Sequence, residues 1–156
     1  MTASLTVEFV LFAVRLVLGA VMVYYGWPKI RDLRAAAREF DIEKGIRPGW
    51  LFGTIVALTE FGGGLLLLLG IIPEFAAAAF AFQMTLGTFW KIKAGKGFPA
   101  WSYDLLALVT ALTVMVLGGG LWSGTYAADW FLRTDVVVLA LVLALAGALM
   151  SKPKRK

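Results

Sequence analysis

The sequence contains no cysteine and no histidine. Their absence excludes disulfides, thiol redox chemistry, cysteine-held iron–sulfur clusters and histidine-ligated haem within this chain. It also removes the commonest zinc ligands. We therefore expect no metal site and no cofactor held within the chain itself.

Charged residues are scarce as well. They make up 16% of 156 residues, whereas 60% are hydrophobic and the mean hydropathy is +0.82. Average soluble domains contain roughly 45–50% apolar residues even with glycine counted, and a soluble domain of this size needs a larger polar surface. The composition predicts a single integral membrane domain. We attribute the net charge of +5 to loops that face anionic lipid, and expect no nucleic-acid partner.

Five apolar stretches predict an all-α bundle of five transmembrane helices. They cover about residues 5–27, 50–72, 75–90, 103–122 and 130–150. All five prolines lie outside these stretches or at their edges, as expected because proline damages a helix interior. All six tryptophans lie at span ends, where amphipathic rings collect at the lipid headgroups. The short connection between the second and third stretches predicts an antiparallel hairpin.

Basic residues predict the orientation. With five spans, nearly all lysines and arginines fall in the loop after the first span, the loop after the third span and the C-terminal tail. The positive-inside rule then places the N-terminus outside and the C-terminus in the cytoplasm, in a multi-pass protein of the plasma membrane.

The loop after the first span has a pattern of its own. Ile30, Leu33, Ala37 and Phe40 recur at three- and four-residue spacing, which predicts an amphipathic helix over about residues 30–44. Such a helix lies either in the cytoplasmic interface or in a solvated loop.

Three polar side chains fall near the midpoints of predicted spans: Arg15 in the first, Glu60 in the second and Gln83 in the third. Because charges at this depth are costly, we expect Arg15 and Glu60 to pair, with Gln83 at the same level. The pair either binds a carboxylate, oxyanion or quinone carbonyl or is a permanent ion pair that only fixes the register of the helices.

Two further charges and a glycine run complete the candidate site. Asp104 lies at the start of the fourth span. It is either a site residue or a negative charge that stabilises the N-terminus of the helix. Lys29 ends the first span on the same side, and is expected to pair with Asp104 or to extend to the headgroups. Gly62–Gly64 follows Glu60, and either packs closely against another helix or leaves space for a flat ligand.

Taken together, these residues form motifs that resemble the DoxX family. The motifs are Arg15–Gly19, Tyr25–Lys29, Glu60–Gly70, Tyr103–Leu106 and Gly118–Ser123. Tyr25 stands where the family has a histidine, and Asp104 where it usually has a glutamate. The resemblance implies a four-helix core, to which the fifth span is an addition. It also implies that Arg15, Lys29, Glu60 and Asp104 are candidate site residues.

The family is similar to the small membrane subunit of thiosulfate:quinone oxidoreductase. The resemblance therefore implies a subunit, non-catalytic or quinone-handling, that anchors a redox partner and contributes a quinone or oxyanion pocket. Quinone is the one cofactor implied. The residues leave two alternatives open: a small-solute transporter or binder, and a structural or assembly protein without a ligand. Beyond the bilayer, the partners expected are a redox subunit or further copies of this chain.

Overall fold

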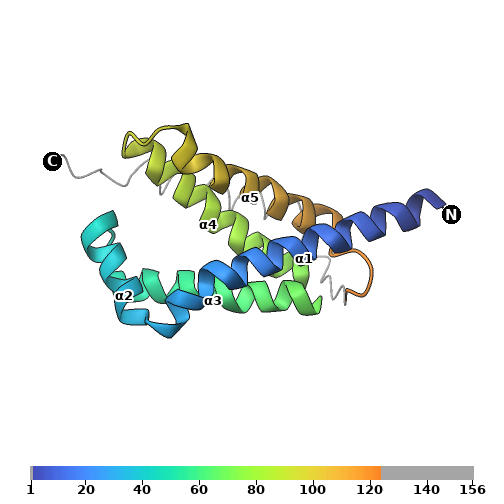
Figure 1. Cartoon of the computed structure of the whole chain (residues 1–156), viewed down its shortest axis with the longest axis horizontal. Coiled ribbons are helices and arrows are strands. Elements are labelled where there is room, and N and C mark those ends of the chain that lie inside the picture. The colour runs from blue at the N-terminus through green and yellow to red at the C-terminus, as the bar shows by residue number, and fades with distance from the viewer. Residues whose placement is uncertain (1, 124–156) are drawn as a thin grey trace.

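The computed structural model describes residues 2–123 as a helical bundle (Figure 1). Its four long helices are α1 (Thr2–Arg31), α3 (Gly49–Leu69), α4 (Pro73–Lys93) and α5 (Phe98–Leu117). Between α1 and α3 lie the short helix α2 (Leu33–Arg38) and the π-helical segment η1 (Glu39–Lys44). The described residues contain no strand, so the predicted all-α class is confirmed. The predicted fifth span, residues 130–150, lies outside the described residues.

Three helices in the described part are long and apolar enough to cross a membrane: Ser4–Arg31, Gly49–Leu69 and Phe98–Leu117. The helical membrane bundle predicted from composition fits this structure. Helix α4 is as long as α3, at 21 residues each, but it is less apolar. Its polar residues Glu74, Gln83 and Lys91 are buried or bonded to other helices. The least apolar long helix therefore carries polar groups into the bundle.

The largest differences from the predicted helix ends are in α1 and α5. Helix α1 continues through Pro28 to Arg31, because a proline near a helix end removes one hydrogen bond without ending the helix. Helix α5 begins at Phe98 and ends at Leu117, so the predicted span of 103–122 is displaced. Pro99 occupies the first turn, where a missing N–H costs little. Gly118 ends the helix with a φ of 89°, which a residue with a side chain rarely adopts.

Glycines bring α1 and α3 into close contact. A Cβ on Gly64 would lie 2.8 Å from the backbone nitrogen of Val23 and 2.9 Å from the carbonyl oxygen of Gly19. A side chain on Gly26 would clash with the backbone of Glu60 and Phe61. The close-packing interpretation of the glycine run is thus confirmed for Gly64. Within residues 2–123 it does not hold for Gly62, where an added Cβ would meet no described atom within 4 Å.

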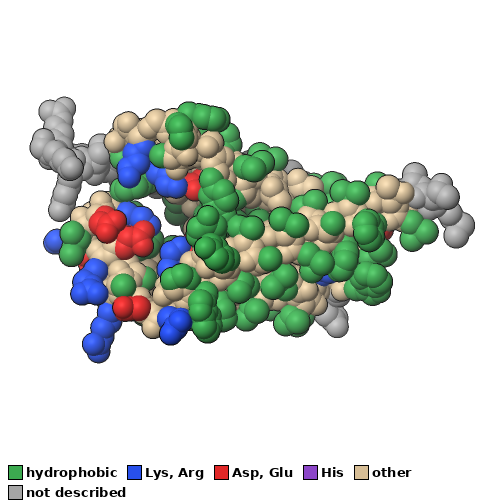
Figure 2. Space-filling model, in the orientation of Figure 1, with side chains coloured by type: hydrophobic (Ala, Val, Ile, Leu, Met, Phe, Trp, Pro, Cys, Tyr) green, Lys and Arg blue, Asp and Glu red, His purple; other side chains and the backbone are tan. Residues whose placement is uncertain are grey.

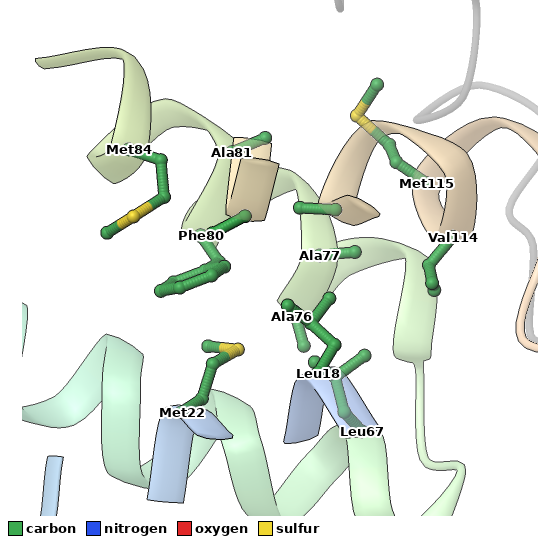
Figure 3. Packing of buried hydrophobic residues seen from close by; sticks show 12 residues of the cluster. Leu18, Met22, Leu67, Ala76, Ala77, Phe80, Ala81, Met84, Val114 and Met115 are labelled. Atoms are coloured by element: carbon green, nitrogen blue, oxygen red, sulfur yellow. The ribbon is translucent and has the colours of Figure 1, made fainter. Parts of the chain in front are cut away.

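An apolar cluster fills the middle of the bundle (Figure 3). It draws Leu18 and Met22 from α1, Leu67 from α3, Phe80 from α4 and Val114 from α5. Four helices therefore share one core, and in a bilayer the close van der Waals packing of these side chains contributes to their association.

The segment that follows α1 packs against α3. Asp32 breaks the helix and caps α2, since its Oδ1 accepts a hydrogen bond from the backbone N–H of Ala35 at 2.9 Å. Phe40 of η1 is buried, and its ring stacks on Phe52 of α3 with 6.5 Å between centroids. The predicted helix over 30–44 is thus two short segments in the structure, and one face of them is covered by α3.

Candidate functional site

Charged side chains gather at one end of the molecule (Figure 2). This end contains α2, η1 and the turn between α4 and α5, while hydrophobic side chains cover most of the remaining visible surface. The two basic loops of residues 2–123 meet there, as predicted, and the indole N–H of Trp90 donates to the carbonyl of Lys44 at 3.2 Å. Which side of the membrane this end faces stays a prediction.

Glu60 is the centre of the first polar group. It is 5% exposed, and its carboxylate receives both the ammonium of Lys29 and the amide of Gln83, the latter at 2.7 Å. Three helices thus meet at one carboxylate. The predicted proximity of Glu60 and Gln83 is confirmed by this hydrogen bond.

Asp104 is the centre of the second polar group. It is also 5% exposed, and the Nζ of Lys91 lies 2.9 Å from its Oδ1 and 2.7 Å from its Oδ2. Asp104 is therefore bound by Lys91, and Lys29 by Glu60. The expected pairing of Lys29 with Asp104 is wrong, because α4 places its own lysine beside Asp104.

These two groups form one site, here called the lysine–carboxylate cluster: Lys29, Glu60, Gln83, Lys91 and Asp104. On α4, Gln83, Gly87 and Lys91 share one face at four-residue spacing. A Cβ on Gly87 would lie 3.2 Å from Oδ2 of Asp104, so the backbone of α4 passes close to that carboxylate.

Two tyrosines border the cluster. Tyr103 interacts electrostatically with both Glu60 and Asp104, and its ring lies 5.5 Å from that of Tyr25, centroid to centroid. Sequence reasoning missed Lys91 and Tyr103 as members of the site. Lys91 follows Gln83 by eight residues, which is two steps of four along one helix face. That spacing was the signal that could have identified the lysine.

One buried polar atom of the cluster, Oε1 of Gln83, has no hydrogen-bond partner among residues 2–123. Buried polar atoms are nearly always satisfied by protein, water or a ligand. The cluster therefore has hydrogen-bonding capacity that the described residues do not use.

Arg15 lies away from this cluster. A side chain on Gly70, at the end of α3, would clash with its guanidinium, whereas Glu60 lies beside Gly26. Gly26 and Arg15 are roughly 16 Å apart along α1, from the rise of about 1.5 Å per residue. The predicted Arg15–Glu60 pair is therefore wrong. The prediction placed Arg15 and Glu60 at equal depth because each lies near the midpoint of its predicted span. In the structure α1 extends to Arg31, and the glycine contacts shift α1 along its axis relative to α3.

Arg15 has its own surroundings near the other end of the bundle. Its side chain is 1% exposed; one nitrogen donates to the carbonyl of Leu121 at 3.2 Å, and its guanidinium lies 5.2 Å from the ring centre of Phe12. The acidic residue that interacts with it electrostatically is Glu74, 5% exposed. Sequence reasoning treated Glu74 only as a hairpin residue, and no spacing in the sequence linked it to Arg15.

An open apolar groove of about 590 Å³ lies along α1 beside the lysine–carboxylate cluster. Tyr25 belongs to the groove and also contacts Tyr103. Trp27 belongs to it too, and its ring lies 5.5 Å from that of Phe61, the neighbour of Glu60. The groove is lined by Ala20, Val23, Tyr24, Tyr25, Trp27, Pro28 and Leu68.

Chemically, the cluster supplies hydrogen-bond donors and carboxylates together. The two ammonium groups and the tyrosine hydroxyls can donate to a carbonyl or an anionic oxygen. The carboxylates of Glu60 and Asp104 can accept protons. Such a site can bind a polar head group and exchange protons with it.

Comparison with known proteins identifies one family. The DoxX family model matches residues 10–93, which is more than half of the chain and covers α1 to α4. No curated protein and no solved structure matches the chain. Arg15, Lys29, Glu60, Gln83 and Lys91 lie within the matched range, whereas Tyr103 and Asp104 lie beyond it.

Proposed function

Because the chain belongs to the DoxX family, we propose that it is the membrane subunit of an oxidoreductase complex. In this proposal it anchors a redox partner in the bilayer and binds a quinone at the lysine–carboxylate cluster. The observation that carries the proposal is the arrangement at Glu60. A buried carboxylate is held by Lys29 and Gln83 from two other helices.

Quinone chemistry suits these side chains. A quinone carbonyl is a hydrogen-bond acceptor, and Lys29 or Tyr103 can donate to it. Reduction of a quinone to a quinol takes up two electrons and two protons, and in this proposal Glu60 and Asp104 pass protons to the head group. The electrons must come from a partner subunit, since the chain has neither cysteine nor histidine to hold a redox centre.

The groove on α1 supports the same proposal. Its apolar lining suits the isoprenoid tail of a quinone, and Tyr25 joins the groove to the cluster. A tail in the groove leaves the head group beside Tyr103 and Glu60. The groove is open along its length, which suits a ligand that exchanges with the bilayer.

The apolar core favours a binding site over a transport route. Between the levels of Arg15 and Glu60, the described helices are packed with apolar side chains, among them Leu18, Met22 and Leu67. A polar solute would need a continuous polar path across this layer. The two polar sites therefore support local binding better than passage through the bundle.

The binding part of the proposal is tested with purified protein in lipid nanodiscs and a short-chain ubiquinone. Quinones quench tryptophan fluorescence, and Trp27 borders the expected site. We expect Lys29→Met and Glu60→Gln to weaken quinone binding by roughly tenfold, since each removes a charged hydrogen-bonding partner from the site. Glu43→Gln, at an exposed position on η1, serves as the control. Equal affinity in all four proteins would contradict a quinone site here.

The subunit part is tested separately. The chain is captured through a C-terminal tag from gently solubilised native membranes, and bound proteins and lipids are identified by mass spectrometry. A stoichiometric redox protein together with enriched quinone supports the proposal. Recovery of the chain alone after chemical crosslinking in the intact membrane would contradict the subunit role, whatever the quinone result.

A further inference from the structure

Arg15 has donor groups that the described residues do not use. Its side chain is almost completely buried, yet Nε and one terminal nitrogen have no hydrogen-bond partner among residues 2–123. Only the second terminal nitrogen is bonded, to Leu121. A buried arginine at membrane depth is costly unless its donors are satisfied. This site therefore calls for an acceptor.

Glu74 lies at the same end of the bundle. It is buried in the first turn of α4 and interacts electrostatically with Arg15, but no ion pair joins the two side chains in the described structure. The loop after α5 contacts both residues. The carbonyl of Leu121 accepts from Arg15, and Oε1 of Glu74 would lie 3.5 Å from a Cβ on Gly118.

Gly118 leaves space beside Glu74. Among residues 2–123, chain neighbours aside, a Cβ built there would meet that carboxylate oxygen and no other atom within 4 Å. The loop thus places no side chain against Glu74 at this position.

We propose that Arg15 and Glu74 form a binding site for a small oxyanion that still carries a proton, as inorganic phosphate does near neutral pH and a phosphate monoester does at about pH 6 and below. Arg15 donates to the unprotonated oxygens of the ligand, and its hydroxyl donates to Glu74. An oxyanion without a proton, such as sulfate or a phosphodiester, presents only acceptors to Glu74. It is rejected by repulsion between like charges and by the carboxylate left without a donor. The site is distinct from the lysine–carboxylate cluster and does not depend on quinone binding.

The structure supplies a reporter for this site. The ring of Trp122 lies edge-on to Phe12 with 5.0 Å between centroids, and Phe12 lies under the guanidinium of Arg15. A ligand on Arg15 should therefore change the fluorescence of Trp122. Trp122→Phe identifies the part of the signal that comes from this residue.

The experiment titrates the protein, in nanodiscs of phosphatidylcholine, with potassium phosphate and with potassium sulfate at equal ionic strength. We expect saturable binding of phosphate and a preference over sulfate of roughly tenfold or more, because a buried carboxylate without a donor costs that much. Arg15→Gln should abolish binding, and Arg15→Lys, which keeps the charge, should weaken it. Lys29→Met should leave it unchanged, which separates this site from the proposed quinone site.

Glu74→Gln gives the sharpest test, because it predicts a gain. An amide can donate a hydrogen bond to a fully deprotonated oxygen, so this variant should bind sulfate nearly as well as phosphate. Equal responses to the two anions in the unchanged protein, or a phosphate response that survives Arg15→Gln, would overturn the proposal.

A lipid could supply the same chemistry. Phosphatidic acid carries a phosphate monoester, and its retention is measured by native mass spectrometry in nanodiscs that also contain phosphatidylglycerol, a phosphodiester. Retention of phosphatidic acid that is lost in Arg15→Gln identifies the lipid as the source, whereas binding of inorganic phosphate alone identifies the free ion. Absence of both overturns the site.

Discussion

The carboxylate of Glu60 forms an ion pair with Lys29. Lys29 lies roughly 20 Å from Arg15 along α1, from the helical rise of about 1.5 Å per residue. The two cations of α1 therefore serve different sites. Lys29 belongs to a cluster at the charged end of the bundle, and Arg15 lies against the turns at the other end. The apolar core of Leu18, Met22 and their neighbours separates the two. The two sites thus lie at different levels of the bundle.

The first prediction concerns the Lys29–Glu60 pair. Glu60→Leu leaves Lys29 without its partner and should destabilise the protein by about 1–3 kcal/mol, below the usual cost for a fully buried pair because the Lys29 side chain is 23% exposed. The double variant Lys29→Met/Glu60→Leu should recover most of this loss. Unfolding by sodium dodecyl sulfate in mixed micelles measures both.

The surface pair Lys44–Glu39 is the matched control, with 2.8 Å between its charged atoms and both side chains at least a quarter exposed. Lys44→Gln should cost less than about 1 kcal/mol. A loss as large as that of Glu60→Leu would show that the Lys29–Glu60 pair has no special energetic role.

The second prediction compares two glycines of α3. Gly64→Ala should destabilise the bundle by about 1–3 kcal/mol, because the new Cβ forces α1 and α3 apart. Gly62→Ala has open space and should be neutral or stabilising by up to about 1 kcal/mol, from helix propensity. Thermal unfolding of the two variants side by side checks the difference. Equal effects would contradict the close contact at Gly64.

The third prediction uses two glycines with the same backbone conformation. Gly70 and Gly95 both have a φ of 70°, but only Gly70 faces the guanidinium of Arg15. Gly95→Ala should cost about 1 kcal/mol for the left-handed backbone alone. Gly70→Ala should cost clearly more, since Arg15 must also move. If the two variants unfold at the same temperature, the guanidinium does not pack on Gly70.

The fourth prediction concerns orientation. The chain has no cysteine, so single cysteines can be introduced without background labelling. We expect a membrane-impermeant maleimide to label Ser4→Cys on intact cells, and Arg34→Cys and Lys96→Cys only after the membrane is opened, because basic loops stay in the cytoplasm. The opposite pattern would invert the predicted topology.

The sequence by itself determined the class of the protein and most of its helices. Composition predicts a helical membrane protein, and prolines mark helix boundaries, as Pro73 does at the start of α4. These features are local, so they can be read from the order of residues. The same reasoning identified Glu60 and Gln83 as neighbours, because both lie near the middle of adjacent helices.

Only the tertiary structure decided which charge meets which. Periodicity says on which face of a helix a residue lies, but it does not say how far one helix is shifted along another. In this bundle the shift of α1 against α3 is set by backbone contacts at Gly26 and Gly64. That shift brings Lys29 to Glu60 and leaves Arg15 beside Glu74. The sequence predicted one site near the middle of the membrane. The structure has two sites, which lie a few helical turns apart along α1.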